Sequence, residues 1–153
     1  MPEVPGSGTV GLRIWNGITA ANVAAYRLSG GRLGGKWKRR NPVLLVDHVG
    51  KRSGRRRTTP LVYTEHGDDL LLVASRGGSD KHPGWFHNLR ANPETTVQVG
   101  TRRVDVTARV ADPEERARLW PVVCEANPDY AAYQRRTDRD IPVIVLSPRG
   151  RRA

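Results

Sequence analysis

The chain has 153 residues and a mass of 17.0 kDa, which fits one domain with a core of its own. Its 26 Lys and Arg against 15 Asp and Glu give a formal net charge of +11, so the surface attracts anions such as nucleic acid, acidic lipid or a polyanionic small molecule. The one cysteine, Cys124, excludes an internal disulfide. The absence of a long apolar run or a basic signal segment predicts a cytoplasmic protein.

The first forty residues are expected to form an amphipathic helix and a basic linker, ahead of one folded unit over residues 41–153. From about residue 8 to residue 28, apolar side chains recur at helical spacing: Val10, Ile14, Ile18, Ala21, Ala25 and Leu28. Gly30 and Gly31 are expected to end this helix. Two interpretations stay open for its apolar face: it packs on the rest of the protein, or it lies on an anionic membrane surface with Trp37 among lysines and arginines.

From Pro42 onward the pattern becomes that of β-structure. Short apolar or alternating runs predict strands over residues 43–46, 58–64, 70–74, 95–99, 104–110 and 141–146. Pro60 lies inside the second run, which predicts a sheet edge or a bulge there. Because the connections are mostly short, the pattern favours a mainly β (α+β) fold, a small antiparallel barrel with peripheral helices, over a parallel doubly wound sheet.

Three short helical segments interrupt the predicted strands. One covers residues 83–89 and another residues 127–137. The middle one starts at Asp112-Pro113-Glu114-Glu115, which supplies a capping carboxylate, a proline at the first position and acids in the first turn. Pro121 is expected to kink or divide that helix.

Several patterns that carry chemistry elsewhere are incomplete here. The glycines of residues 6–11 match a dinucleotide fingerprint without the strand that must precede it, and residues 30–36 match most of a P-loop but are followed by Trp37 in place of a hydroxyl. The four histidines show no metal spacing, and Cys124 is expected to be a buried, inert thiol. The sequence therefore predicts no metal site.

The most informative segment is the basic run that joins the first two predicted strands. Residues 51–57 hold five cations in seven positions, and no acid occurs between Asp47 and Glu65. Gly50 and Gly54 allow tight turns, and arginine binds phosphate or carboxylate with two hydrogen bonds. The spacing fits an anion site and a solvated hairpin tip equally well. Nucleic acid is a third possibility, although no aromatic residue lies within the run.

Two further segments suggest a ligand site. Residues 74–83 lead from a strand through glycines into a short helix, which suits an anion or a carbonyl but is also an ordinary strand-to-helix turn. Tyr130 and Tyr133 lie on one helical face, where they pack on the barrel or form the wall of a site for a flat aromatic substrate and donate a proton.

Together these segments resemble the deazaflavin-dependent nitroreductase family, which includes quinone reductases that use coenzyme F-420. The resemblance covers about residues 41–148. It is carried by Gly50-Lys51-Arg52-Ser53-Gly54 with Arg57 and Pro60-Leu61, by Ala74-Ser75-Arg76-Gly77-Gly78, Pro83-x-Trp85 and Asn88-Leu89-x-Ala91-Asn92-Pro93, and by Glu114-Glu115-Arg116-Ala117 and Thr137-Asp138-Arg139-x-Ile141-Pro142-Val143. The family implies a split β-barrel, similar to the FMN-binding split barrels, with the cofactor in a groove. F-420 carries a phosphate and an oligoglutamate tail, which suits the basic run.

The resemblance also implies roles for individual residues. The phosphate end of the cofactor is expected at Lys51, Arg52, Ser53 and Arg57, and the ring along Thr58, Thr59, Pro60, Leu61 and Val62. The ring edge is expected at Val73, Ala74, Ser75 and Arg76, with Gly84, Trp85, Phe86, His87 and Asn88 on the other side. Catalytic roles toward the acceptor are expected for Tyr130, Tyr133 and Ser75. Asn127 stands where a relative has a further tyrosine, a departure that bears on bulky nitroimidazole acceptors.

The expected function is hydride transfer from reduced F-420 to a quinone, a nitroaromatic compound or a similar conjugated acceptor. Two alternatives are a non-enzymatic cationic protein that binds nucleic acid and an FMN-dependent split-barrel oxidoreductase. The expected partners are a small-molecule acceptor and the anionic inner face of the membrane, and the protein is expected to be a monomer or a homodimer.

Overall fold

The computed structural model describes residues 21–32, 36–37 and 41–149. Residues 21–29 are helical. The strands are β1 (Lys36–Trp37), β2 (Asn41–Val49), β3 (Arg56–Val62), β4 (Thr64–His66), β5 (Asp69–Val73), β6 (Glu94–Val99), β7 (Arg102–Val110) and β8 (Val143–Pro148). The other helices are the short 3₁₀ helix η1 (Arg76–Gly78), α2 (Gly84–Ala91), α3 (Pro113–Ala126) and α4 (Asp129–Gln134). All six predicted strands and the three predicted helical segments are present.

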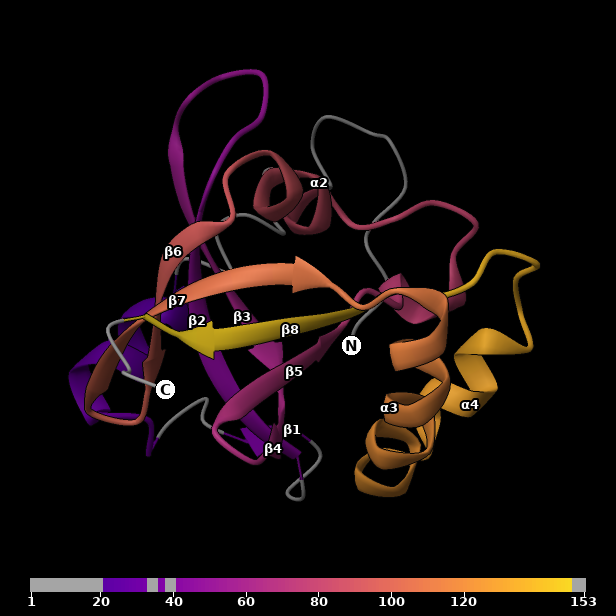
Figure 1. Ribbon diagram of the computed structural model, residues 1–153. Coiled ribbons are helices and arrows are strands. Elements are labelled where there is room, and N and C mark those ends of the chain that lie inside the picture. The colour runs from indigo at the N-terminus through magenta and orange to yellow at the C-terminus, as the bar shows by residue number, and fades with distance from the viewer. Residues whose placement is uncertain (1–20, 33–35, 38–40, 150–153) are drawn as a thin grey trace.

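The sheet curls into a barrel because one strand path bends. The strands pair antiparallel in the order β1-β2-β6-β7-β8-β5-β4, and β3 pairs with the other edge of β2. β3 and β4 are separated in the chain only by Tyr63. The chain leaves its ladder with β2 at this bend and enters the ladder with β5, so the bend joins the two ends of the strand order. The predicted split β-barrel is confirmed, with α2 across one end and α3 and α4 along one side (Figure 1).

Pro60 lies in β3 opposite Leu45. Among the described strands β3 pairs with β2 alone, so its other edge is free. A proline has no N–H to donate to a neighbouring strand, and on an edge strand none is required on the free side. The predicted edge position is confirmed.

Two apolar clusters occupy the two faces of the curled sheet. Alternate residues of the strands meet inside the barrel with the apolar side of α2, in a cluster that includes Leu44, Val46, Leu72, Val106, Ile144, Leu146, Trp85, Phe86 and Leu89. The outer faces of β5 and β8 are covered by α3 and α4, in a cluster that includes Leu71, Val73, Val143, Val145, Leu119, Val123 and Tyr130. Residues 143–146 of β8 form a continuous apolar run because both of its faces are buried.

The helices that cover the outer face agree with the prediction at the start of α3 and differ from it in two other respects. Asp112 caps α3 as expected, and its carboxylate accepts the N–H of Glu115 at 2.8 Å. Pro121 does not divide α3, which runs through it as one helix while Leu119 and Val123 on either side pack against the sheet. α4 ends at Gln134, three residues before the predicted end, because the following residues turn back toward the loop after β5.

The helix over residues 21–29 ends before Gly30 and Gly31, as predicted, and the side that packs on the barrel is not the one that carries Leu28. Leu28 is 90% exposed, whereas Tyr26 is 1% exposed and faces the barrel. The Tyr26 hydroxyl donates to the carbonyl of Val43 at 3.0 Å and accepts the N–H of Gly100 at 2.8 Å. These two hydrogen bonds determine which side of the helix is buried. The upstream positions of the predicted stripe lie outside the described residues.

Replacing Tyr26 with phenylalanine is expected to lower the free energy of unfolding by about 1–3 kcal/mol, because the Val43 carbonyl and the Gly100 N–H lose their partner. Urea denaturation measures the change. Leu28→Ala removes an exposed side chain from the same helix and is the control, with an expected change within about 0.5 kcal/mol. Equal changes in the two variants would contradict the assignment of Tyr26 as the anchor.

Candidate functional site

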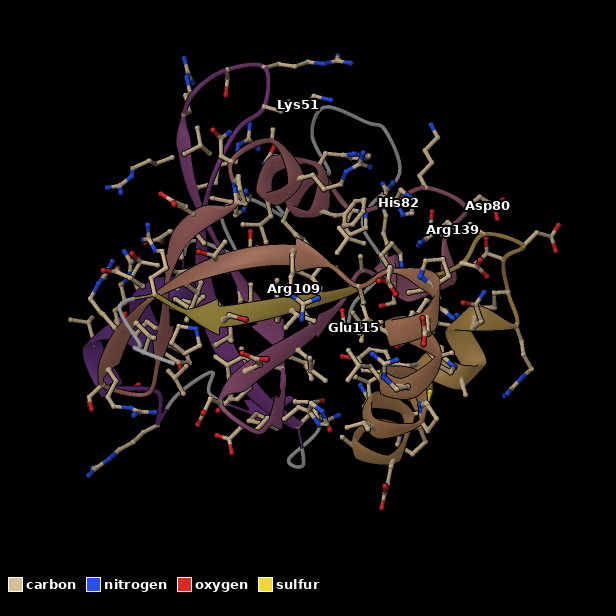
Figure 2. The ribbon with its side chains drawn as sticks, viewed as in Figure 1. Lys51, Asp80, His82, Arg109, Glu115 and Arg139 are labelled. Carbon is tan, nitrogen blue, oxygen red and sulfur yellow. The ribbon has the colours of Figure 1, made fainter. Side chains whose placement is uncertain are left out.

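The basic hairpin, residues 50–57, joins β2 to β3 and projects beyond the end of the barrel, where Figure 2 shows Lys51. Residues 51–57 are all exposed. The turn is nevertheless closed: the Gly50 N–H donates to the carbonyl of Arg55 at 2.8 Å, and the Gly54 N–H donates to that of Gly50 at 2.9 Å. Gly54 has φ +69°, which favours glycine. Within the described residues no acid pairs with the hairpin's five cations, so they are available to an anionic ligand.

A row of polar contacts connects this hairpin to α2 and to β3. The Lys51 N–H donates to Asn88 Oδ1 at 2.9 Å, and Asn88 Nδ2 lies 2.8 Å from His48 Nδ1. On the other side of the ring, His48 Nε2 lies 2.8 Å from Thr59 Oγ1. The structure therefore brings together three predicted cofactor residues, Lys51, Thr59 and Asn88. His48, which links two of them, was not predicted, because nothing in its neighbouring sequence marks it.

His48 is 6% exposed, and its surroundings favour the neutral ring. Burial and the positive charge of Arg57 lower the pKa of His48 from 6.5 to about 4, against a smaller opposite effect of Asp47. His48 is therefore neutral near pH 7 in the folded protein.

The lowered pKa predicts a stability change in mild acid. In the unfolded chain His48 binds a proton below about pH 6.5, whereas the folded protein resists protonation until about pH 4. The stabilising contribution is therefore complete above pH 6.5 and is lost as the pH falls toward 4. We expect wild type to lose about 2 kcal/mol more than His48→Asn between pH 7 and pH 4.5. Urea denaturation at the two pH values measures this, and parallel losses would contradict it.

The second loop, residues 74–83, is held by Arg139 from the segment that precedes β8. The Arg139 guanidinium donates to the carbonyls of Ala74 at 3.2 Å, Ser75 at 2.8 Å and Ser79 at 2.7 Å. It also lies 3.0 Å from His82 Nδ1. Figure 2 shows Arg139 beside His82 and Asp80 at this side of the molecule. One side chain thus determines the path of most of the loop.

The neighbours of Arg139 in the chain reinforce this arrangement. Thr137 donates to the Asp80 carboxylate at 2.8 Å, and Arg136 donates to the Gly77 carbonyl at 3.2 Å. A Cβ atom at Gly78 would lie 2.7 Å from the carbonyl oxygen of Tyr133. α4 therefore packs directly on the second loop, which brings the predicted tyrosine segment next to the predicted loop of Ser75.

Two buried polar atoms at this site have no hydrogen-bond partner within the described part of the protein: Ser75 Oγ and Trp85 Nε1. Ser75 is 1% exposed and Trp85 6% exposed. Buried donors are normally paired in folded proteins. The Ser75 O–H lies at the start of the second loop and the Trp85 N–H at the start of α2. Both groups suit a ligand with carbonyl oxygens or ring nitrogens that accept hydrogen bonds. With the cations of the hairpin, this donor set fits a cofactor that combines a heterocycle with an anionic tail.

The remaining predicted cofactor residues divide by exposure. Thr58, Pro60, Arg76 and His87 are half-buried and Gly84 is exposed, whereas Leu61, Val62, Val73, Ala74 and Phe86 are buried. Of the buried ones, Leu61, Ala74 and Phe86 belong to the cluster inside the barrel.

The two predicted catalytic tyrosines differ in environment. Tyr130 is 5% exposed and packs in the outer cluster, and burial raises its pKa to about 12 although a hydrogen bond with Asn127 acts in the other direction. Tyr133 is half-buried, its ring centroid lies 6.5 Å from that of Tyr130, and the Arg136 guanidinium lies over the Tyr133 ring at 5.6 Å from its centroid. Of the two phenols, that of Tyr133 is the more accessible to a ligand.

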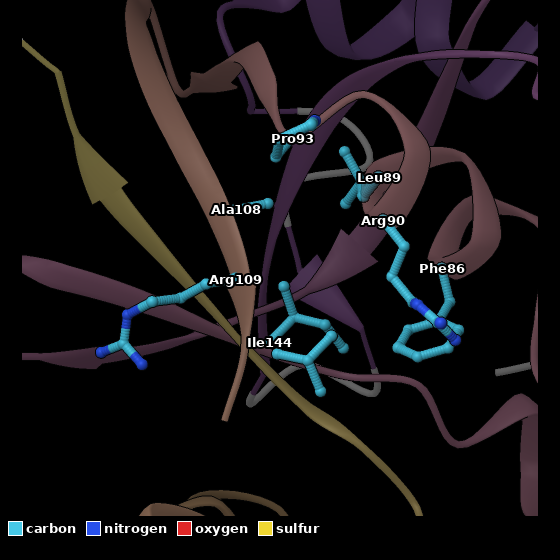
Figure 3. A pocket seen from close by; sticks show the side chains of 8 residues that line it. Phe86, Leu89, Arg90, Pro93, Ala108, Arg109 and Ile144 are labelled. Carbon is cyan, nitrogen blue, oxygen red and sulfur yellow. The ribbon is translucent and has the colours of Figure 1, made fainter. Parts of the chain in front are cut away.

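Two hollows in the described structure lie away from the hairpin. One of about 290 Å³ opens between α2, β7 and β8 and is lined by Phe86, Leu89, Arg90, Pro93, Ala108, Arg109, Val110 and Ile144 (Figure 3). The other, of about 380 Å³, adjoins β5, β8 and α3 and is lined by His66, Asp69, Leu71, Arg109, Glu115, Arg118, Leu119 and Val145. Phe86 is the one predicted site residue in either lining. A ligand held by the hairpin and the second loop would therefore occupy a different part of the surface.

The curled sheet with a helix across one end defines a protein of the split β-barrel class. The chain belongs to the F420H(2)-dependent quinone reductase family, whose model matches residues 19–148. It is 45% identical over 129 residues to an F420H(2)-dependent quinone reductase of Mycobacterium tuberculosis. The match covers 82% of this chain and 87% of the relative. This membership favours the predicted reductase over the nucleic-acid-binding and FMN-dependent alternatives.

Solved structures agree with this family membership. A structure described as an F420-H2 dependent reductase is 43% identical, with a TM-score of 0.64, and the match covers 69% of this chain and 94% of that one. A second structure, described as a domain-swapped dimer, is 35% identical, with a TM-score of 0.66, and the match covers 88% of this chain and 98% of that one.

Proposed function

We propose that this protein binds reduced coenzyme F-420 and catalyses hydride transfer from it to a quinone. Membership of the F420H(2)-dependent quinone reductase family carries the proposal. The chemistry of the site supports it, because the hairpin offers five cations without acidic partners among the described residues to a cofactor with a phosphate and an oligoglutamate tail.

In this proposal the hairpin holds the anionic end of the cofactor. Lys51, Arg52 and Arg57 supply positive charge, and Ser53 adds a hydroxyl. Gly50 permits the close turn, since a Cβ there would lie 2.5 Å from Ser53 Oγ. The proposal assigns the ring end to Thr58 to Val62, which belong to β3 with its free edge, and to the second loop.

The bound cofactor supplies the hydride, and the protein aligns the acceptor and stabilises the charge that develops on it. A quinone that accepts hydride becomes negatively charged at one oxygen, so a hydrogen-bond donor aimed at that oxygen favours the reaction. The buried Ser75 hydroxyl, unpaired within the described residues, suits this role. Tyr133 forms a wall of the acceptor site, and Tyr130, neutral near pH 7, supports Tyr133 from the outer cluster.

The proposal is tested with the purified protein and oxidised F-420, whose fluorescence is followed during a titration. We expect saturable binding at micromolar concentrations, followed by turnover when menadione is added to the reduced cofactor with enzyme. FMN and a random DNA duplex are the comparison ligands, and we expect both to bind at least about tenfold more weakly, which is about 1.4 kcal/mol. Absence of F-420 binding, or tight FMN binding with a yellow protein, would refute the proposal.

The acceptors in this proposal extend to nitroaromatic compounds.

The proposal also places the protein in the cytoplasm, in contact with the anionic inner face of the membrane. Leu28 is 90% exposed on the helix over residues 21–29, and Arg27 and Arg32 in the same segment are exposed, a combination of residue types that suits a surface of acidic lipid. No helix in the described ranges is long and apolar enough to span a bilayer. Sedimentation with vesicles of phosphatidylglycerol, compared with phosphatidylcholine, tests this contact with wild type and Leu28→Asp.

A further inference from the structure

The hydrogen bonds around His48 determine its tautomer. A backbone N–H can only donate, so the Asn88 side-chain oxygen must face Lys51, where the two atoms lie 2.9 Å apart. The Asn88 NH₂ group then faces His48 Nδ1 at 2.8 Å and must donate to it. His48 Nδ1 therefore carries a lone pair, the ring proton lies on Nε2, and Nε2–H donates to Thr59 Oγ1 at 2.8 Å.

Protonation of His48 would disrupt this row of contacts. An N–H at Nδ1 would face the NH₂ group of Asn88, so two donors would meet. If the Asn88 amide turned over to accept from the ring, its NH₂ group would face the Lys51 N–H instead. The neutral ring is thus the one form that satisfies the Lys51 amide, and Arg57, on the strand opposite His48, also disfavours a second positive charge here.

The Asn88 contact also fastens the hairpin to the body of the protein. In the part of the chain that the structure describes, the other hydrogen bonds of residues 50–55 lie within the turn: the Gly50 N–H donates to the Arg55 carbonyl, the Gly54 N–H to the Gly50 carbonyl and the Arg55 N–H to Ser53 Oγ. Within the described residues, Asn88 is the side chain outside the hairpin that bonds to it. Loss of this contact would leave the cations attached through the β2–β3 ladder alone. A turn that is already ordered loses less entropy when it binds a ligand.

We propose that His48, in its neutral Nε2–H form, is a positioning residue that holds Asn88 in the orientation in which it presents the basic hairpin to the anionic end of the cofactor. This inference rests on the proposed function, because it assigns the hairpin's ligand to F-420. His48 acts through Asn88 and is not expected to touch the cofactor.

Two substitutions at His48 separate its two hydrogen bonds. In His48→Asn the amide oxygen can lie near the position of Nδ1 and accept from Asn88, while the bond to Thr59 is lost. In His48→Gln the longer amide can reach Thr59 with its nitrogen, while the acceptor for Asn88 is lost. We expect His48→Gln to weaken the binding of oxidised F-420 at least about tenfold, which is about 1.4 kcal/mol, and His48→Asn to change it less than threefold.

The two variants serve as controls for each other, because each removes one buried hydrogen bond and a purely structural role predicts equal effects. Thermal unfolding verifies that both are folded, and kcat at saturating F-420 and menadione is expected to stay within twofold of wild type. Equal dissociation constants for the two variants would overturn the inference while leaving the proposed function intact. Failure of the wild type to bind F-420 would overturn both, which distinguishes the two failures.

A readout without cofactor examines the geometry directly. Long-range ¹⁵N–¹H correlation spectra of the wild type are expected to show His48 as the Nε2–H tautomer at pH 7. In Asn88→Asp the NH₂ group is replaced by an acceptor, so we expect the pKa of His48 to rise and its ring to gain a proton at Nδ1. An Nδ1–H tautomer in the wild type, or an unchanged pKa in Asn88→Asp, would overturn the inference whatever the binding data show.

Discussion

Replacing Arg52 and Arg57 together with alanine is expected to weaken the binding of F-420 about 100-fold, with little change in stability. Each exposed guanidinium that pairs with a phosphate or carboxylate of the cofactor contributes about 1.4 kcal/mol after screening by solvent, and two such losses multiply. Because the hydride is transferred at the other end of the cofactor, kcat at saturation is expected to stay within about threefold. A fluorescence titration and steady-state kinetics measure the two quantities.

The matched control for this experiment is Arg118→Ala with Arg135→Ala, which removes the same net charge from two exposed positions on α3 and just after α4. We expect less than a twofold loss of affinity in the control. Raising the salt concentration is expected to narrow the difference between the two double variants, since exposed charges are screened. If both double variants lose affinity equally, the overall charge and not the hairpin is responsible.

Replacing Arg139 with leucine is expected to have the largest effect on the fold near the site. Three carbonyls, of Ala74, Ser75 and Ser79, lose their donor at once, and each unsatisfied group costs about 1 kcal/mol or more. We therefore expect a loss of about 3 kcal/mol in the free energy of unfolding, measured by urea denaturation. Because the second loop carries Ser75, reductase activity is expected to fall at least about tenfold even at temperatures where the variant is folded.

Arg139→Lys tests the geometry of this contact with the charge retained. A lysine ammonium cannot reach three carbonyls from one planar group, so we expect it to restore less than half of the lost stability. Arg118→Ala, in which an exposed arginine on α3 is removed, is expected to change stability by less than about 0.5 kcal/mol. A lysine variant as stable as wild type would show that the charge alone holds the loop.

Much of the fold could be predicted from local patterns. Alternating apolar residues indicated the six strands, Asp112 indicated the start of α3, and Pro60 indicated a free edge at β3. These signals are local, because each depends on the conformation of a few neighbouring residues. The side of the helix over residues 21–29 that faces the barrel has no such local signal, because the rotation of the helix depends on Tyr26 reaching Gly100, 74 positions away.

The candidate site shows the same division. The cations of the hairpin, the glycines of the second loop and the tyrosine pair are evident in the sequence, and their order carries the resemblance to the family. His48 and Arg139 are not, because their roles depend on partners such as Asn88, 40 positions away, and Ser75, 64 positions away. A histidine in a strand and an arginine before a strand have no local feature that reveals such partners.

The amino-acid sequence by itself determined six of the eight described strands, the cationic turn between β2 and β3, and the family to which the chain belongs. The tertiary structure alone decided which side of the first described helix is buried, that the base of the hairpin is fastened through Asn88 to a neutral His48, and that Arg139 holds the second loop. The physical reason is the range of the interactions. Backbone preferences and hydrophobic periodicity act between neighbours in the chain, whereas these hydrogen bonds exist only after the curled sheet has brought distant segments together.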